Sequence, residues 1–154
     1  MVAVNPVLYL ESLCSDVGTM MIDRLVFDIA GQGLHDITER VRAAVDNANI
    51  VEGLCTLYLR HTSASLLIQE NYDSAVKKDL QNWLNRPVPE GDSLYTHTLE
   101  GADDMPAHLK TALTAVSISI PVLDGKLALG TWQGIFLWEH RTSPQRRDLV
   151  LHLL

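Results

Sequence analysis

The dipeptide Asp124-Gly125 restricts the fold of this chain more than any other short segment. It separates two apolar runs, "SISIPVL" and "KLALG". Type I′ turns need positive φ at both central residues, which Asp-Gly adopts readily, so the two runs are predicted to be neighbouring antiparallel strands. "GTWQGIFLWEH" and "DLVLHLL" follow with the same strand composition. The C-terminal part of the chain is therefore predicted to be a series of strands with short connections.

The first half of the chain combines strands with a helix. Apolar residues occupy every second position from 25 to 29, which is the period of a half-buried strand. Farther on, Asp36 stands three residues before Glu39, the spacing of a capping box, and apolar residues recur at every fourth position from 37 to 45. This second segment is predicted to be an amphipathic helix. The run "GLCTLYLRHTSASLLI" then predicts two strands or one bent strand.

Two further helices are predicted. Asp73 is placed to cap the first, which stops before Pro87. The residues of this helix that are predicted to point inward are Val76, Leu80, Trp83 and Leu84. Asp104 and Pro106 mark the start of the second helix. Strands mixed with two to three helices predict an α+β fold of mostly antiparallel, sandwich-like sheets.

Length, charge and cysteine content limit the domain count and the function classes. The 154 residues, 47% of them hydrophobic, suit one core, so we expect an N-terminal extension at 1–20 and a single domain at 21–154. A formal charge of -7 argues against a nucleic-acid binder, because affinity for phosphate backbones needs clustered Lys and Arg. Cys14 and Cys55 lack the spacing of a disulfide framework or a zinc site. The absence of a long apolar run and of a basic leader predicts a cytoplasmic protein without membrane association.

Polar residues cluster at the ends of the predicted elements, where functional sites are usually built. The clusters are His61, Thr62 and Ser63; Glu70, Asn71 and Asp73; His97 and Glu100; Asp103, Asp104, His108 and Lys110; and Gln133 with Glu139, His140 and Arg141. Asp104 and His108 are four residues apart and therefore share one face of a helix. With His97 they could bind a cation: imidazoles plus one carboxylate suit zinc, and an oxygen-rich set suits magnesium. The alternative is a helix cap beside a surface histidine.

The end of the tryptophan-rich strand carries an unusual run of charge. Strand alternation places Glu139 on the same side as Ile135 and Leu137, so its carboxylate is predicted to face a neighbouring subunit or a pocket. Arginines follow at 141, 146 and 147 in an otherwise acidic chain, and guanidinium groups bind phosphate through two hydrogen bonds. Ion pairing with acidic residues is the alternative. The chain contains no GxSxG, P-loop or GxGxxG motif, which argues against common hydrolase and nucleotide-binding classes.

Four sequence blocks resemble those of the YjbQ family, which is described as a family of secondary thiamine-phosphate synthases. The blocks are "LRHTSASLLIQEN", "HTLEGADDMPAHLKTAL", "SISIPVLDGKLALGTWQGIFLWEHR" and the later Arg146-Arg147 pair. The resemblance runs from about Met21 to Leu154. It implies an α+β homotrimer with a polar pocket lined by the motif residues, and a transferase that joins a pyrimidine diphosphate to a phosphorylated thiazole with release of diphosphate.

The resemblance also implies roles for individual residues. The predicted catalytic residues are His61, Ser63, Glu70, Asn71, Asp104, Gln133 and Glu139. The predicted phosphate-binding residues are Lys110, Arg141, Arg146 and Arg147. A divalent cation, Zn²⁺ or Mg²⁺, is expected at His97, His108 and His61. All of these roles require that the motif residues meet in one cavity.

Two other functions fit the same residues. The first is a metal-dependent hydrolase of a small substrate, with His97 and His108 as ligands and with Glu139 or Asp104 as the base. The second is a non-catalytic trimer that binds a small phosphorylated metabolite.

Overall fold

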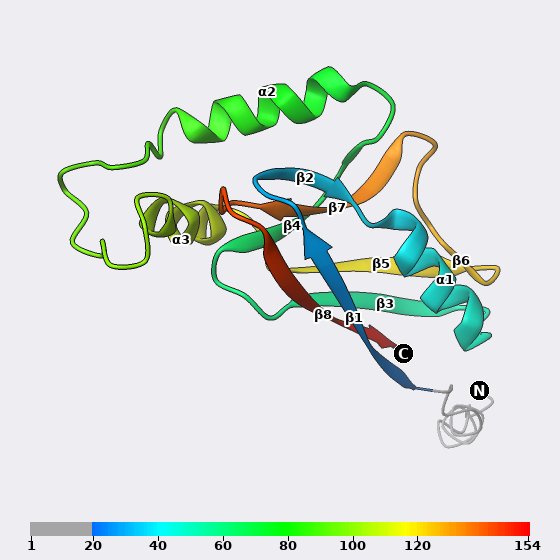
Figure 1. Cartoon of the computed structure of the whole chain (residues 1–154). Coiled ribbons are helices and arrows are strands. Elements are labelled where there is room, and N and C mark those ends of the chain that lie inside the picture. Colours follow the sequence, from blue (N-terminus) through cyan, green and yellow to red (C-terminus); the bar gives the residue numbers. More distant parts are fainter. Residues whose placement is uncertain (1–19) are drawn as a thin grey trace, which may run out of the picture.

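Two antiparallel sheets and three helices make up residues 20–154, the part of the chain that the computed structural model describes (Figure 1). The elements, in chain order, are β1 (Met21–Ile29), β2 (Gly33–Asp36), α1 (Thr38–Ala48), β3 (Gly53–Leu59), β4 (Ala64–Glu70), α2 (Ser74–Asn85), α3 (Asp104–Leu113), β5 (Ser117–Leu123), β6 (Lys126–Leu127), β7 (Gln133–Glu139) and β8 (Gln145–Leu153). The predicted α+β class is confirmed. The predicted extension at 1–20 lies outside the described residues except for its last residue, and the homotrimer stays a prediction.

The strands form a curled half-barrel. The larger sheet has the order β1-β8-β3-β5-β6 and the smaller one has the order β2-β7-β4, with every described pair antiparallel. The hairpin between β5 and β6 has the predicted turn, because Asp124 and Gly125 have φ values of 51° and 76°. Within residues 20–154, no helix has the length and apolar content that crossing a bilayer requires.

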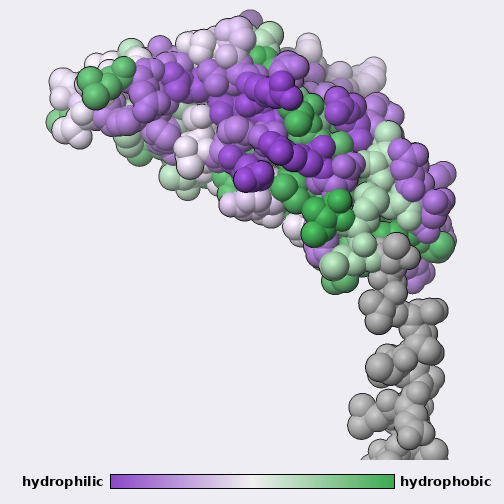
Figure 2. Space-filling model, turned by 60° about the horizontal axis from the view of Figure 1, so that its bottom comes forward, coloured by the Kyte–Doolittle hydropathy of each residue, from purple (hydrophilic) through white to green (hydrophobic). Residues whose placement is uncertain are grey.

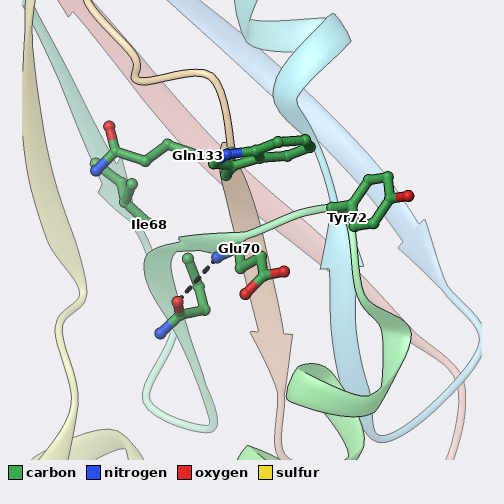
Figure 3. Close-up of a pocket in the computed structure, with 6 residues that line it drawn as sticks. Ile68, Glu70, Tyr72 and Gln133 are labelled. Carbon is green, nitrogen blue, oxygen red and sulfur yellow. Dashed lines mark hydrogen bonds between the residues drawn. The ribbon is translucent and has the colours of Figure 1, made fainter.

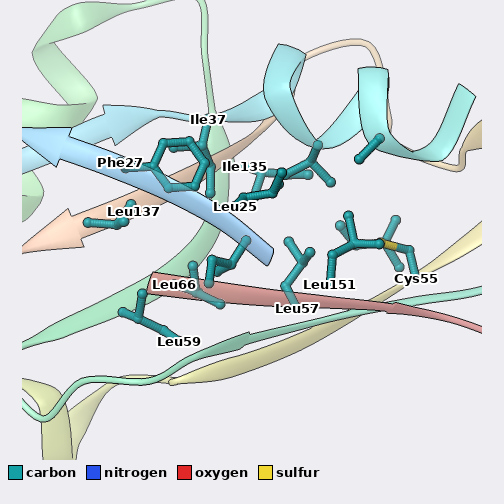
Figure 4. Packing of buried hydrophobic residues seen from close by; sticks show 14 of the residues in the cluster. Leu25, Phe27, Ile37, Cys55, Leu57, Leu59, Leu66, Ile135, Leu137 and Leu151 are labelled. Carbon is teal, nitrogen blue, oxygen red and sulfur yellow. The ribbon is translucent and has the colours of Figure 1, made fainter. Parts of the chain in front are cut away.

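The hydrophobic core lies between the sheets and α1 (Figure 4). Alternate residues of β3 and β8 point into it, and Leu57 and Leu151 pair directly across the two strands. The predicted apolar face of α1 packs onto this core through Val41 and Val45. The capping box did not form: α1 begins one residue later, and Asp36 Oδ1 instead accepts a hydrogen bond from the Thr38 amide at 2.9 Å.

Strand β7 is the central strand of the smaller sheet and is buried on both faces. Ile135 and Leu137 point into the core, as predicted. The opposite face carries Phe136 and Trp138, and the Trp138 indole Nε1 donates to Gln81 Oε1 of α2 at 2.7 Å. Helix α2 therefore lies over this second face.

Helix α2 buries less than its pattern predicts. Asp73 does cap it, since its carboxylate accepts the Ala75 amide at 2.8 Å. Of the four residues predicted to point inward, only Leu84 is buried, and Trp83 is 58% exposed. A cavity of about 260 Å³ remains under the helix, with Trp83 and Trp138 among its walls.

Candidate functional site

The first turn of α3 holds the densest cluster of functional side chains. Asp104 and His108 lie one turn apart on the same face, as predicted, and Asp104 Oδ2 is 3.2 Å from His108 Nε2. The connection 86–103, which projects from the body beside α3 (Figure 1), brings His97 Nε2 to 2.8 Å from the same oxygen. The two imidazole rings are tilted, with their centroids 5.5 Å apart.

These three side chains form the candidate metal centre. One donor atom from each of His97, Asp104 and His108 lies within 4.8 Å of the other two. Two imidazole nitrogens and one carboxylate oxygen match the ligands that zinc prefers in catalytic sites, where three protein donors leave a position for water or substrate. The carboxylate is almost fully buried, whereas both imidazoles are partly exposed. Solvent and a ligand therefore reach the centre from the histidine side.

Backbone contacts fix which nitrogen of His108 faces the centre. His108 Nδ1 is 2.9 Å from the Thr62 carbonyl oxygen, which can only accept a hydrogen bond. Nδ1 therefore carries a proton, and Nε2 is the nitrogen that faces Asp104 Oδ2 and the centre. Hydrogen bonds of this kind to a carbonyl commonly orient histidines that bind metals.

A cavity of about 350 Å³ opens next to the centre and includes His97 in its wall. Its other lining residues come from the same connection and are mostly small or hydroxylated: Gly91, Asp92, Ser93, Tyr95, Thr98, Gly101 and Ala102. Glu100 adds an exposed carboxylate whose Oε1 lies 4.0 Å from His97 Nε2. The cavity is large enough for a small polar molecule.

Glu139 faces neither a pocket nor a surface that a neighbouring subunit could contact, the two alternatives that strand alternation suggested. It is 0% exposed, and both of its oxygens accept hydrogen bonds of 2.6 Å from the Arg147 guanidinium. Arg147 also donates to Ser63 Oγ at 3.0 Å. The predicted residues Ser63, Glu139 and Arg147 therefore form a buried ion-pair cluster, because β8 carries Arg147 across to the end of β7.

His140 and Lys110 are also buried. His140 Nε2 lies 3.0 Å from Ser65 Oγ, and Nδ1 has no hydrogen-bond partner among the described residues. Burial lowers the pKa of His140 to about 3, and the nearby charges of Lys110 and Arg147 add to this effect. Lys110 Nζ donates to Asn85 Oδ1 at 2.7 Å, and burial lowers its pKa as well.

The four residues predicted to bind phosphate do not surround one cavity. Arg147 is occupied by Glu139, Lys110 is buried against Asn85, and Arg141 donates to Asp103 and Asp104. Arg146 is exposed on β8 and is paired in register with Asp28 of β1. Three of the four cations thus have their donors directed at other protein groups.

Strand register separates the remaining predicted residues from the candidate metal centre. Glu70 pairs with Gln133 at one end of the β4–β7 ladder, and Ala64 pairs with Glu139 at the other. The seven residues of β4 span about 20 Å, so the two ends of the ladder are far apart. The prediction that all of these residues line one shared cavity is therefore wrong within one chain. Asn71 lies at the Gln133 end, where its amide donates to the Trp132 carbonyl at 3.0 Å.

A second cavity, of about 430 Å³, lies at this far end (Figure 3). Glu70, Tyr72 and Gln133 surround it, and the Tyr72 and Trp132 rings meet edge to face at 4.9 Å. Sequence reasoning did not single out either ring as a site residue. Both are largely exposed, and exposed aromatic residues next to a predicted site residue are the signal that could have identified them.

His61 stands apart from the metal donors as well. Its Nε2 accepts the Asp148 amide at 2.7 Å, which fixes the ring against β8. Burial lowers the pKa of His61, and Arg147 lowers it further. Because this lone pair already has a partner, the predicted role of His61 as a third metal ligand does not fit the geometry.

The fold and the site define a half-barrel α+β protein with a candidate centre of two histidines and one aspartate. The chain belongs to the UPF0047 family of YjbQ-like proteins, whose model matches residues 25–154. The UPF0047 protein sll1880 of Synechocystis is 48% identical over 129 residues, which cover 84% of this chain and 88% of that protein. YjbQ of Salmonella typhimurium is 43% identical over 123 residues, covering 79% and 88%.

Solved structures of similar proteins have the same fold. The conserved hypothetical protein TT1486 of Thermus thermophilus has a TM-score of 0.77 at 35% identity, covering 86% of this chain and 99% of that one. The Sulfolobus solfataricus protein SSO2532, described as a YbjQ-like protein of unknown function, has a TM-score of 0.79 at 26% identity, covering 88% and 96%.

These comparisons overturn the predicted thiamine-phosphate synthase activity. The family model is described only as a UPF0047 protein, and the relatives named above carry no synthase description. The resemblance of the sequence blocks therefore identified the family correctly and its reaction wrongly. The associated assignment to thiamine biosynthesis is unsupported for the same reason.

Proposed function

We propose that this protein is a metal-dependent hydrolase whose single divalent cation, Zn²⁺ by preference, is held by His97, Asp104 and His108. The observation that carries the proposal is the convergence of three donors of the right type within 4.8 Å. An oxygen-rich set, which Mg²⁺ would need, is not what these residues supply. Such a cation, when bound, activates water or polarises a substrate oxygen.

The residues around the centre supply the other requirements of hydrolysis. Thr62 orients His108, and the cavity beside His97 admits a small polar substrate. The sequence suggested Glu139 or Asp104 as the base. Glu139 is instead ion-paired with Arg147, and Asp104 is one of the proposed metal ligands. Glu100 is the carboxylate that is both close to His97 and exposed, so we assign the base to it.

The first test is metal binding by the purified full chain. Calorimetry and metal analysis should give one Zn²⁺ per chain. His108→Ala should weaken Zn²⁺ affinity by more than the 10- to 100-fold that is typical of losing an outer-shell partner. His152→Ala, on the solvent-facing side of β8, is the matched control and should bind Zn²⁺ like the unaltered protein. Absence of stoichiometric binding, or equal affinity in His108→Ala, would contradict the proposed centre.

The reaction is tested with the wild-type protein and one further variant, Glu100→Gln. Zn²⁺-loaded protein should hydrolyse members of a panel of small esters and amides, and Glu100→Gln should lose turnover while keeping Zn²⁺. Turnover that is equal in the wild type and in Glu100→Gln would exclude Glu100 as the base.

The homotrimer implied by the family resemblance is retained in the proposal. The face of the larger sheet that points away from the core carries exposed apolar side chains, among them Ile22, Leu54, Tyr58 and Leu123. In Figure 2, hydrophobic residues gather toward the lower right of the coloured surface. Exposed apolar area of this kind favours association between chains. Light scattering should give three times the 17.1 kDa chain mass, and a monomer would exclude the trimer.

A further inference from the structure

We infer that Arg141 is the positioning residue of the candidate metal centre: it holds one oxygen of Asp104 so that the other faces both histidines. This inference rests on the metal site proposed above. Arg141 was predicted to bind phosphate, and its contacts give it a different role.

All three nitrogens of the Arg141 guanidinium group donate hydrogen bonds to residues 100–104, the segment that leads into α3. Nη1 donates to Asp104 Oδ1, Nε donates to Asp103 Oδ2 at 3.1 Å, and Nη2 donates to the Glu100 carbonyl at 2.8 Å. The side chain is 15% exposed. Each of the three guanidinium nitrogens thus has a protein acceptor, so we do not assign Arg141 a phosphate ligand.

These three contacts join the two parts of the centre. Asp104 and His108 belong to α3, whereas His97 belongs to the connection before it. The Glu100 carbonyl lies three residues after His97, so Arg141 fastens this connection to the start of the helix. Gly101 has a φ of 110°, and a Cβ there would lie 3.7 Å from Arg141 Nη2 and 3.1 Å from Asp103 Oδ1. The glycine thus permits the chain to turn closely around the guanidinium.

Arg141 is itself fixed from the interior of the protein. Its backbone amide donates to Glu139 Oε1 at 2.9 Å, and the same oxygen accepts from the buried Arg147. The next residue, Thr142, donates to Asp103 Oδ2 through its amide at 2.8 Å and through its hydroxyl at 2.9 Å. The end of β7 is therefore a rigid platform that presents Arg141 to Asp104.

The chemical consequence concerns how many donors the centre offers. With Oδ1 occupied by Arg141, Asp104 presents Oδ2 alone, at 2.8 Å from His97 Nε2 and 3.2 Å from His108 Nε2. Asp104 would therefore bind a cation through one oxygen, so the three side chains would supply three donors and leave a position for water or substrate. Without Arg141 the carboxylate is free to rotate and to bind through both oxygens.

The test measures Zn²⁺ and Co²⁺ binding to the full chain. Arg141→Gln should weaken Zn²⁺ affinity by about 10- to 100-fold, the range found when an outer-shell partner is lost. Its Co²⁺ complex should show a changed visible spectrum, because the carboxylate coordination changes. Arg141→Lys should not restore the affinity, since an ammonium group cannot make three planar contacts. Millimolar guanidinium added to Arg141→Ala should restore part of it.

Arg42→Gln, at an exposed arginine of α1 that was given no role in the site, is the matched control and should bind both ions like the wild type. Thermal unfolding of each variant reports whether it is folded. Wild-type affinity and an unaltered Co²⁺ spectrum in folded Arg141→Gln or Arg141→Lys would overturn the inference while leaving the metal site intact. Failure of the wild type to bind either ion would contradict the proposed function and this inference together.

Discussion

Replacing Arg147 by Met is expected to lower the free energy of unfolding by about 3–5 kcal/mol, the usual cost of removing one partner from a buried ion pair. Glu139 is 0% exposed, and its two hydrogen bonds to Arg147 are both 2.6 Å long. The substitution leaves a buried carboxylate with only the Arg141 amide as a donor. The methionine fills most of the space, so the loss is chiefly electrostatic.

Urea unfolding of three variants separates this effect from a general sensitivity of β8. Arg24→Met removes another ion pair that involves β8, through Asp148, but Arg24 and Asp148 lie at the surface, so the midpoint should hardly change. The double variant Glu139→Leu/Arg147→Met should be less destabilised than Arg147→Met alone, because no unpaired charge is left inside. A midpoint for Arg147→Met equal to that of Arg24→Met would show that the buried pair contributes little.

Local patterns predicted the elements of the fold well. The turn at Asp124-Gly125, the apolar face of α1 and the start of α3 at Asp104 all depend on neighbours within one or two turns of the chain. The spacing of residues along the chain is enough to predict such contacts. The poor burial of Trp83 in α2 shows the limit, because the partner surface for that helix is set by distant strands.

The candidate site was predicted only where it depends on local spacing. Asp104 and His108 are four residues apart on a helix, so their common direction follows from the helical period. The separation of Glu70 and Gln133 from this pair follows instead from the register of β4 against β7. Residue order does not reveal that register, so one shared cavity was predicted for residues that the structure places at two separate cavities.

Buried polar residues were the other source of error. Glu139, His140 and Lys110 all sit near the ends of elements, where polar side chains usually mark the surface. Each is instead buried, and Glu139 in particular is buried because β8 delivers a charge partner from a position farther along the chain. Glu139 of this cluster also accepts a hydrogen bond from the Arg141 amide. Because the sequence did not reveal this burial, Glu139 and Arg147 were predicted to bind substrate, whereas the structure pairs them with each other.

The buried imidazole of His140 should make stability depend on pH in mildly acidic solution. Its pKa is about 3 in the folded protein and 6.5 when exposed, because burial and the charges of Lys110 and Arg147 disfavour the imidazolium. Between these values the unfolded chain binds a proton that the folded chain does not. The stability contribution is therefore complete above pH 6.5 and is lost progressively as the pH falls toward 3, at a rate approaching about 1.4 kcal/mol per pH unit.

Urea unfolding between pH 7 and pH 4.5 measures this slope, and comparison with a matched variant cancels the contribution of the carboxylates that begin to be protonated at the acidic end. His140→Gln should flatten the dependence by about 1 kcal/mol per pH unit, since glutamine has no proton to gain. His152→Gln, on the solvent-facing side of β8, serves as the matched control and should keep the wild-type slope. An unchanged slope in His140→Gln would mean that the imidazole is reached by water and protonated in the folded state, because only a charged His140 removes the difference in bound protons on which the slope depends.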